Sequence, residues 1–104
     1  MEDGANAVRG EAALRVGGVT LVLRPSFAAL VAAEGELGPL FALVERAAAG
    51  KLALSEMVAL FWHCLRERPD GMMREDFAEG VTAGGLAAAT PALKGLLGQI
   101  LAGR

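Results

Sequence analysis

Apolar residues dominate the segment from Ser55 to Arg68, in the second half of the chain. When successive residues are advanced by about 100°, as in an α-helix, the apolar side chains cover an arc of roughly 200°. These side chains are Met57, Val58, Leu60, Phe61, Trp62, Cys64 and Leu65. A surface helix usually has an apolar stripe of about 100°. The pattern therefore predicts a helix that lies at the centre of a small core, or that divides its apolar surface between the core and a partner.

Alternation between Gly10 and Arg24 predicts a two-stranded β-hairpin. Gly17-Gly18 suits a two-residue turn because both positions tolerate positive φ. Folding about this turn sets Glu11 opposite Arg24 and pairs apolar residues across one face. The apolar pairs are Val16 with Val19, Leu14 with Leu21, and Ala12 with Leu23. A lone hairpin is marginal in water, so this face should lie on helices, while the outer edges remain able to accept a strand from another chain.

Helical periodicity and capping residues divide the rest of the chain into five segments. Pro25 and Ser26 are expected to start the first helix, Ser55 and Thr90 are expected N-caps, and Gly50 and Gly84-Gly85 are expected stops. The predicted helices span residues 26–37, 39–49, 55–67, 74–83 and 90–102. The fold class is therefore α+β and mostly helical, with an N-terminal two-stranded antiparallel hairpin packed on four to five short helices. Residues 1–9 are expected to form a flexible tail, and residues 10–103 a single globular domain.

Two details of this pattern leave alternatives open. In the first helix, Phe27, Leu30, Val31 and Leu37 are expected to share the inner face, and Glu34 falls inside that stripe. Glu34 either bends out to solvent at the helix end or makes a buried contact with an arginine or with helix N–H groups. In the last helix, Gly95 and Gly98 either lie on a solvated face or allow another backbone to approach.

Charge and composition narrow the possible partners. The formal net charge is −2, the pI is about 5.3 and the mean hydropathy is +0.44. Without a basic field, nucleic-acid binding is disfavoured. The single cysteine excludes an internal disulfide and fits a reducing, cytoplasmic location. The N-terminal residues match neither a signal nor a transit peptide, and no apolar run is long enough for a membrane span.

The sequence offers no constellation typical of catalysis or metal binding. His63 and Cys64 are adjacent on one helix, so their side chains diverge by about 100° and cannot act together as base and nucleophile. His63 is expected to be solvated, and Cys64 to be an inert core residue. No second histidine or cysteine exists to complete a zinc site. The acids between Asp70 and Glu79 lack the spacing of a calcium loop. We therefore expect a protein that is not an enzyme and has no cofactor or metal.

Several short motifs, taken in order, resemble a known family. They are Gly-Glu-Ala-Ala-Leu-Arg-Val-Gly-Gly over residues 10–18, Leu-Arg-Pro-Ser-Phe-Ala-Ala-Leu over residues 23–30 followed by Glu34, Gly-Lys-Leu over residues 50–52 before the helix with Trp62, and Gly-Leu-Ala-Ala-Ala-Thr-Pro over residues 85–91. This order is similar to that of the small tail assembly chaperone-like proteins of bacterial gene transfer agents and related prophages. The similarity covers about residues 10–103.

The resemblance implies a non-enzymatic role in building a phage-like tail, with the tape-measure protein or another tail protein as partner. Apolar helix faces suit this role because they can accept an amphipathic helix of a partner. The candidate contact residues are Trp62, Leu97 and Leu101, and the alternative is that all three belong to the core. Two alternatives remain open. One is a minor tail or connector subunit that forms a homo-oligomeric ring through its hairpin edges, and the other is a regulatory interaction module.

Overall fold

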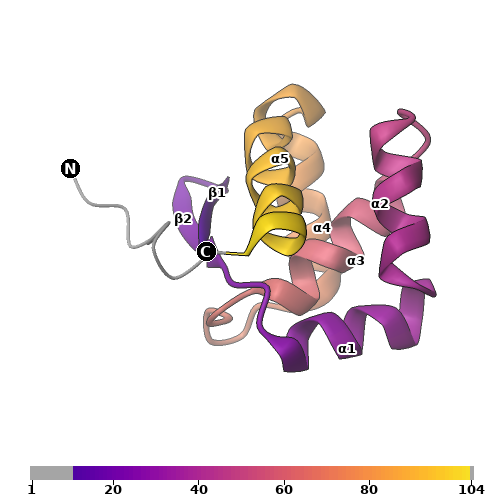
Figure 1. The fold of residues 1–104 in the computed structure, drawn as a ribbon. Helices are drawn as coiled ribbons and strands as arrows, with labels where there is room; N and C mark the ends of the chain where they lie inside the picture. The colour runs from indigo at the N-terminus through magenta and orange to yellow at the C-terminus, as the bar shows by residue number, and fades with distance from the viewer. Residues whose placement is uncertain (1–10, 104) are drawn as a thin grey trace.

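The computed structural model describes residues 11–103, so the expected tail at residues 1–9 and the first hairpin residue, Gly10, lie outside it. The described elements are β1 (Ala12–Val16), β2 (Val19–Leu23), α1 (Phe27–Leu37), α2 (Leu40–Ala48), α3 (Leu54–Cys64), α4 (Arg74–Ala83) and α5 (Leu86–Ala102). They confirm the predicted fold class, α+β and mostly helical with an N-terminal hairpin. In Figure 1, α3 crosses the middle of the molecule, with the hairpin and α5 on one side and α1 and α2 on the other.

The hairpin has the predicted register at every pair. Ala12 lies opposite Leu23, Leu14 opposite Leu21, and Val16 opposite Val19. Gly17 and Gly18 form the turn with φ values of 58° and 81°, a conformation that side-chain-bearing residues rarely adopt. On the leucine and valine face, Leu14, Val16, Leu21 and Leu23 are buried, as the marginal stability of a lone hairpin requires, whereas Val19 beside the turn is exposed.

Backbone hydrogen bonds attach the outer edge of β2 to the end of α3. The Arg24 N–H donates to the Cys64 carbonyl at 2.6 Å, and the Arg66 N–H donates to the Val22 carbonyl at 2.8 Å. Leu65 forms an isolated antiparallel bridge with Leu23. Because this segment must be extended to pair with β2, α3 ends at Cys64 and not at residue 67 as predicted.

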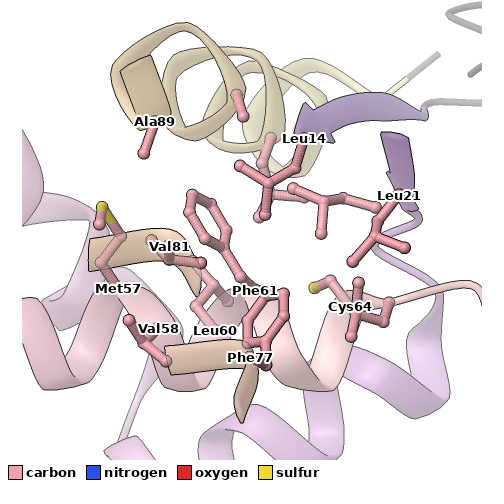
Figure 2. Packing of buried hydrophobic residues seen from close by; sticks show 14 of the residues in the cluster. Leu14, Leu21, Met57, Val58, Leu60, Phe61, Cys64, Phe77, Val81 and Ala89 are labelled. Atoms are coloured by element: carbon pink, nitrogen blue, oxygen red, sulfur yellow. The ribbon is translucent and has the colours of Figure 1, made fainter. Parts of the chain in front are cut away.

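The core is built around α3, which buries Met57, Val58, Ala59, Leu60, Phe61 and Cys64. Figure 2 shows Leu14 and Leu21 pointing from the hairpin toward Phe61 and Cys64, while Phe77, Val81 and Ala89 close the same space from α4 and α5. The largest side chains with almost no exposure are Phe61, Phe77, Leu23, Leu43, Leu60 and Leu96. The long apolar arc predicted for this segment therefore lies mainly in the core.

The first helix packs in a different rotation from the predicted one. Ala33 is fully buried and Leu30 is half-buried, whereas Phe27 is 85% exposed and Val31 is also exposed. The predicted inner stripe was wrong for Phe27 and Val31. Apolar or small residues occupy most sides of this helix, so periodicity alone did not select a face. The structure packs α1 on α3 through the side that carries Ala29 and Ala33, where short side chains allow close approach.

The last helix begins at Leu86, four residues before the predicted N-cap. Thr90 is inside the helix, where its hydroxyl donates to the Leu86 carbonyl at 3.1 Å. Pro91 also lies inside α5, so one hydrogen bond to the Ala87 carbonyl is missing. The helix-favouring alanines before Thr90 extend the helix backward to Gly85, whose φ of 88° marks the turn.

Carboxylates cap three helix starts. Glu34 is exposed and accepts a hydrogen bond from the Leu40 N–H at 2.9 Å, so it combines features of both alternatives from the sequence. Its carboxylate serves the start of α2, where Pro39 has no side-chain acceptor. Glu56 accepts from the Ala53 N–H at 3.0 Å, and Asp76 from the Met73 N–H at 3.1 Å. The predicted N-cap Ser55 lies inside α3, which begins one residue earlier.

Gly80 is the helical glycine with the tightest surroundings. A Cβ atom there would lie 2.4 Å from Cγ1 of the buried Val16, in β1. A Cβ at Gly95 would lie 3.6 Å from the Cβ of Ala12, an ordinary contact, and one at Gly98 would meet nothing within 4 Å. The tightest contact of a helical glycine is therefore between Gly80 of α4 and the Val16 side chain of β1, and not at a glycine of α5.

We expect Gly80→Ala to lower the free energy of unfolding by about 1–2 kcal/mol, because overpacking costs about 1–3 kcal/mol and exceeds the gain in helix propensity. Chemical denaturation would measure it. The matched variant Gly98→Ala should raise stability by about 0.5–1 kcal/mol, since the same propensity gain meets no neighbour. Equal effects of the two substitutions would contradict the close contact between α4 and β1.

Candidate partner-binding surfaces

Trp62 lies at the edge of the core, near the end of α3. Its ring packs against Phe77 with centroids 5.6 Å apart and planes tilted by 51°. The Arg68 guanidinium lies over the same ring at 4.3 Å and also donates to the Trp62 carbonyl. This arrangement is a cation–π contact on an aromatic pair. Most of the ring is therefore occupied by neighbours within the domain.

The other two candidate contact residues lie on α5. Leu97 is half-buried and packs against the core, whereas Leu101 is 60% exposed. Trp62 thus has its ring contacts with α4 and the loop after α3, while Leu97 and Leu101 belong to another helix. Leu101 is the one of the three that presents most of its side chain to solvent.

Two exposed aromatic residues, Phe27 at the start of α1 and Phe41 in α2, were not among the contact residues predicted from the sequence. Their exposed fractions are 85% and 81%, the largest among the large hydrophobic residues exposed in residues 11–103. We call them the outer phenylalanines. The signal that could have indicated Phe27 is the uncharged alanine face of α1, which competes with the Phe27 face for the core.

An apolar groove of about 440 Å³ runs between α3 and α4. It is lined by Leu54, Ser55, Val58, Arg74, Glu75, Ala78 and Thr82. Leu54 is 41% exposed within it, while Val58 forms a buried part of its wall. We call it the α3–α4 groove. Its lining carries apolar surface next to few polar groups, as is typical of binding grooves.

Arg74, in this groove, is held by an ion cluster that joins three helices. Its guanidinium makes two hydrogen bonds to the Glu36 carboxylate at the end of α1, one of them 2.8 Å long. His63 of α3 lies 2.8 Å from the same carboxylate. The hydrogen bonds from Arg74, and then from His63, lower the pKa of Glu36 to about 2. His63 was expected to be solvated, but its side chain is largely covered and paired.

A second ion cluster fixes the base of the hairpin. The Glu11 carboxylate is buried and accepts from Arg24 at 2.9–3.0 Å. Arg66, which follows α3, donates to both oxygens of the same carboxylate at 3.2–3.3 Å. The predicted pair of Glu11 with Arg24 is confirmed, and Arg66 completes it from a distant part of the chain. A buried carboxylate requires such partners, so this cluster has a structural role.

Reactive groups are scarce in the described residues. Burial raises the pKa of the Cys64 thiol to about 12, so the nucleophilic thiolate is suppressed. Residues 11–103 contain no group of three metal-ligating side chains. Within the same residues no single helix is long and apolar enough to span a membrane, although two bent pairs, α1 with α2 and α4 with α5, meet the same criteria of length and composition.

A protein-family model described as "Phage tail tube protein, GTA-gp10" matches residues 9–103. The chain belongs to this family. No curated protein and no solved structure matches it. Membership of this family supports the predicted connection with gene transfer agents and phage tails. It also supports an interaction with other tail proteins. The family description names a tail tube protein and not a chaperone, so the finer role needs a separate argument.

The lowered pKa of Glu36 predicts a specific acid response. A carboxylate whose pKa is depressed by folding stabilises the protein fully above its unfolded pKa, near 4.5, and this contribution is lost as the pH falls toward 2. We therefore expect Glu36→Gln to reduce the melting temperature at pH 7, and the difference from wild type to shrink between about pH 4.5 and 2.

Glu45→Gln is the matched control, because Glu45 is exposed on α2 and has no ion pair among residues 11–103. Thermal unfolding followed by circular dichroism at several pH values would measure both variants. A difference between Glu36→Gln and wild type that stays constant from pH 7 to 2 would contradict the coupling of Glu36 to Arg74 and His63.

Proposed function

We propose that this protein is a non-enzymatic assembly chaperone that binds the tape-measure protein during construction of a phage-like tail. The observation that carries the proposal is the apolar helical surface left uncovered on so small a domain, above all the outer phenylalanines Phe27 and Phe41. Exposed aromatic residues of this kind are costly for a protein that acts alone, and they are typical of sites that bind another protein. Binding and release of a helical partner require no catalytic group.

Membership of a tail family supports the general role, and the resemblance to tail assembly chaperone-like proteins supports the finer one. A tape-measure protein is expected to be long, helical and prone to aggregation before the tube forms round it. A chaperone for it needs apolar surfaces that accept amphipathic helices reversibly. Both the outer phenylalanines and the α3–α4 groove meet this requirement.

A tail tube subunit is the second candidate, because the family description names one. A ring formed through hairpin edges would need β1 of one subunit to pair with β2 of the next, as in any head-to-tail assembly. The β2 edge already bonds to residues 64–66 of its own chain. Pairing through β1 alone would be two-fold and would stop at a dimer. A tube subunit of this fold would therefore have to assemble through its helices.

Co-purification distinguishes these two candidates. We expect the tagged chain, isolated from its native host before particles are complete, to retain the tape-measure protein, and we expect finished particles to lack the chain. Mass spectrometry of both samples measures this directly. Recovery of the chain from purified particles in fixed proportion to other tail subunits would assign it to the tube and reject the chaperone role.

The double substitution Phe27→Ser and Phe41→Ser tests the outer phenylalanines. Because both side chains are largely exposed, the change in unfolding free energy should stay within about 1 kcal/mol. Binding of the tape-measure protein should fall at least about tenfold, since exposed aromatics that become buried often dominate binding energy. Val19→Ser is the control, because it removes an exposed apolar side chain from the hairpin turn. Unchanged retention of the tape-measure protein by the folded double variant would remove this surface from the proposal.

A further inference from the structure

The α3–α4 groove has the shape expected of a binding site for a third helix. On α3, Leu54 and Val58 are four residues apart, and on α4, Arg74, Ala78 and Thr82 follow at the same spacing. Residues at this spacing form one ridge along a helix. Two such ridges with an apolar floor between them can receive the ridge of another helix. The small side chains of Ala78 and Ser55 leave room for larger side chains of the incoming helix.

Glu75 brings negative charge to the α4 side of this groove. Glu75 lies in the groove lining, and Glu79 is exposed one residue after Ala78 and four residues after Glu75. Neither acid has an ion-pair partner among residues 11–103. Arg74 is the basic residue in the lining, and Glu36 neutralises it through two hydrogen bonds. Like charges four residues apart on a helix repel each other, so the repulsion between Glu75 and Glu79 opposes the favourable effect of Glu75 in the first turn of α4.

We infer that the α3–α4 groove binds a basic amphipathic helix, whose apolar stripe lies on Leu54, Val58 and Ala78 and whose Lys or Arg side chains face Glu75 and Glu79. This inference rests on the proposed function for the identity of the partner, a segment of the tape-measure protein. A helix with acidic flanks is excluded by repulsion from the same two carboxylates. The repulsion between Glu75 and Glu79 is relieved when cationic groups approach them.

Two labelled peptides of 18 residues serve as probes for the full chain. Both carry leucines at helical positions i, i+3, i+4 and i+7, one with lysines beside the leucines and the other with glutamates. Fluorescence anisotropy measures their binding at low salt. We expect the lysine peptide to bind at least about tenfold more tightly, and the preference to weaken with added salt.

The double substitution Glu75→Lys and Glu79→Lys should abolish or reverse this preference, since Glu75 lines the groove, Glu79 is exposed one helical turn after it, and neither has an ion pair among residues 11–103 to lose. Glu45→Lys with Glu67→Lys is the matched control, because it makes the same change in net charge at exposed acids outside the α3–α4 groove. Circular dichroism confirms that each variant is folded. Equal binding of both peptides, no binding of either, or an equal effect of the control would overturn the inference.

Co-expression with the tape-measure protein separates this inference from the proposed function. Loss of retention in the Glu75→Lys, Glu79→Lys variant, with retention by wild type and by the control, supports both. Retention by all three overturns the groove as the site for this partner and leaves the chaperone role intact. Retention by none, with peptide binding as expected, supports the groove chemistry and rejects the tape-measure protein as the partner.

Discussion

The hydrogen bonds between β2 and residues 64–66 are the constraint on which the rest of the structure depends. They attach a hairpin that would be marginal alone to the central helix, and they force α3 to end at Cys64. The same segment brings Arg66 to the buried Glu11 carboxylate, so the backbone pairing and the ion cluster stabilise one junction. With the hairpin held there, its leucines close the core over Phe61 (Figure 2). As a result, the end of the β2 edge at residues 22–24 is already paired within the chain and is not available to another chain.

The rotation of α1 links packing to surface chemistry. Packing through Ala33 and its neighbours lets α1 lie close to α3, and the Glu36 carboxylate at its end then reaches both His63 and Arg74. The consequence is that Phe27 cannot turn inward. Phe27 is therefore exposed because of the orientation of the whole helix. Moving it inward would require α1 to rotate and the three-helix ion cluster to break.

Local signals predicted the parts of the fold that depend on neighbouring residues. The hairpin register follows from Gly17-Gly18 and the alternation on each side, so it was predicted pair by pair. Contacts between distant segments could not be predicted from these local signals. The rotation of α1 depends on how closely α3 can approach, the end of α3 depends on pairing with β2, and the contact of Gly80 with Val16 joins elements more than 60 residues apart.

The candidate residues from sequence were chosen for apolar periodicity, which identifies core and surface residues alike. The outer phenylalanines and the α3–α4 groove required knowledge of which apolar side chains the core leaves out.

The uneven distribution of free surface favours a transient partner over a permanent ring. A closed ring needs two complementary surfaces on each subunit, and the hairpin offers at most one edge. The helical side offers outer phenylalanines on α1 and α2 and a separate groove between α3 and α4 that has Glu75 in its lining. Surfaces of this kind complement a long amphipathic helix better than they complement each other, because the outer phenylalanines carry no positive charge that could pair with Glu75 in the groove. In the chaperone role proposed above, such a subunit would bind at successive points along a helical protein and would leave when a tube with stronger lateral contacts replaces it.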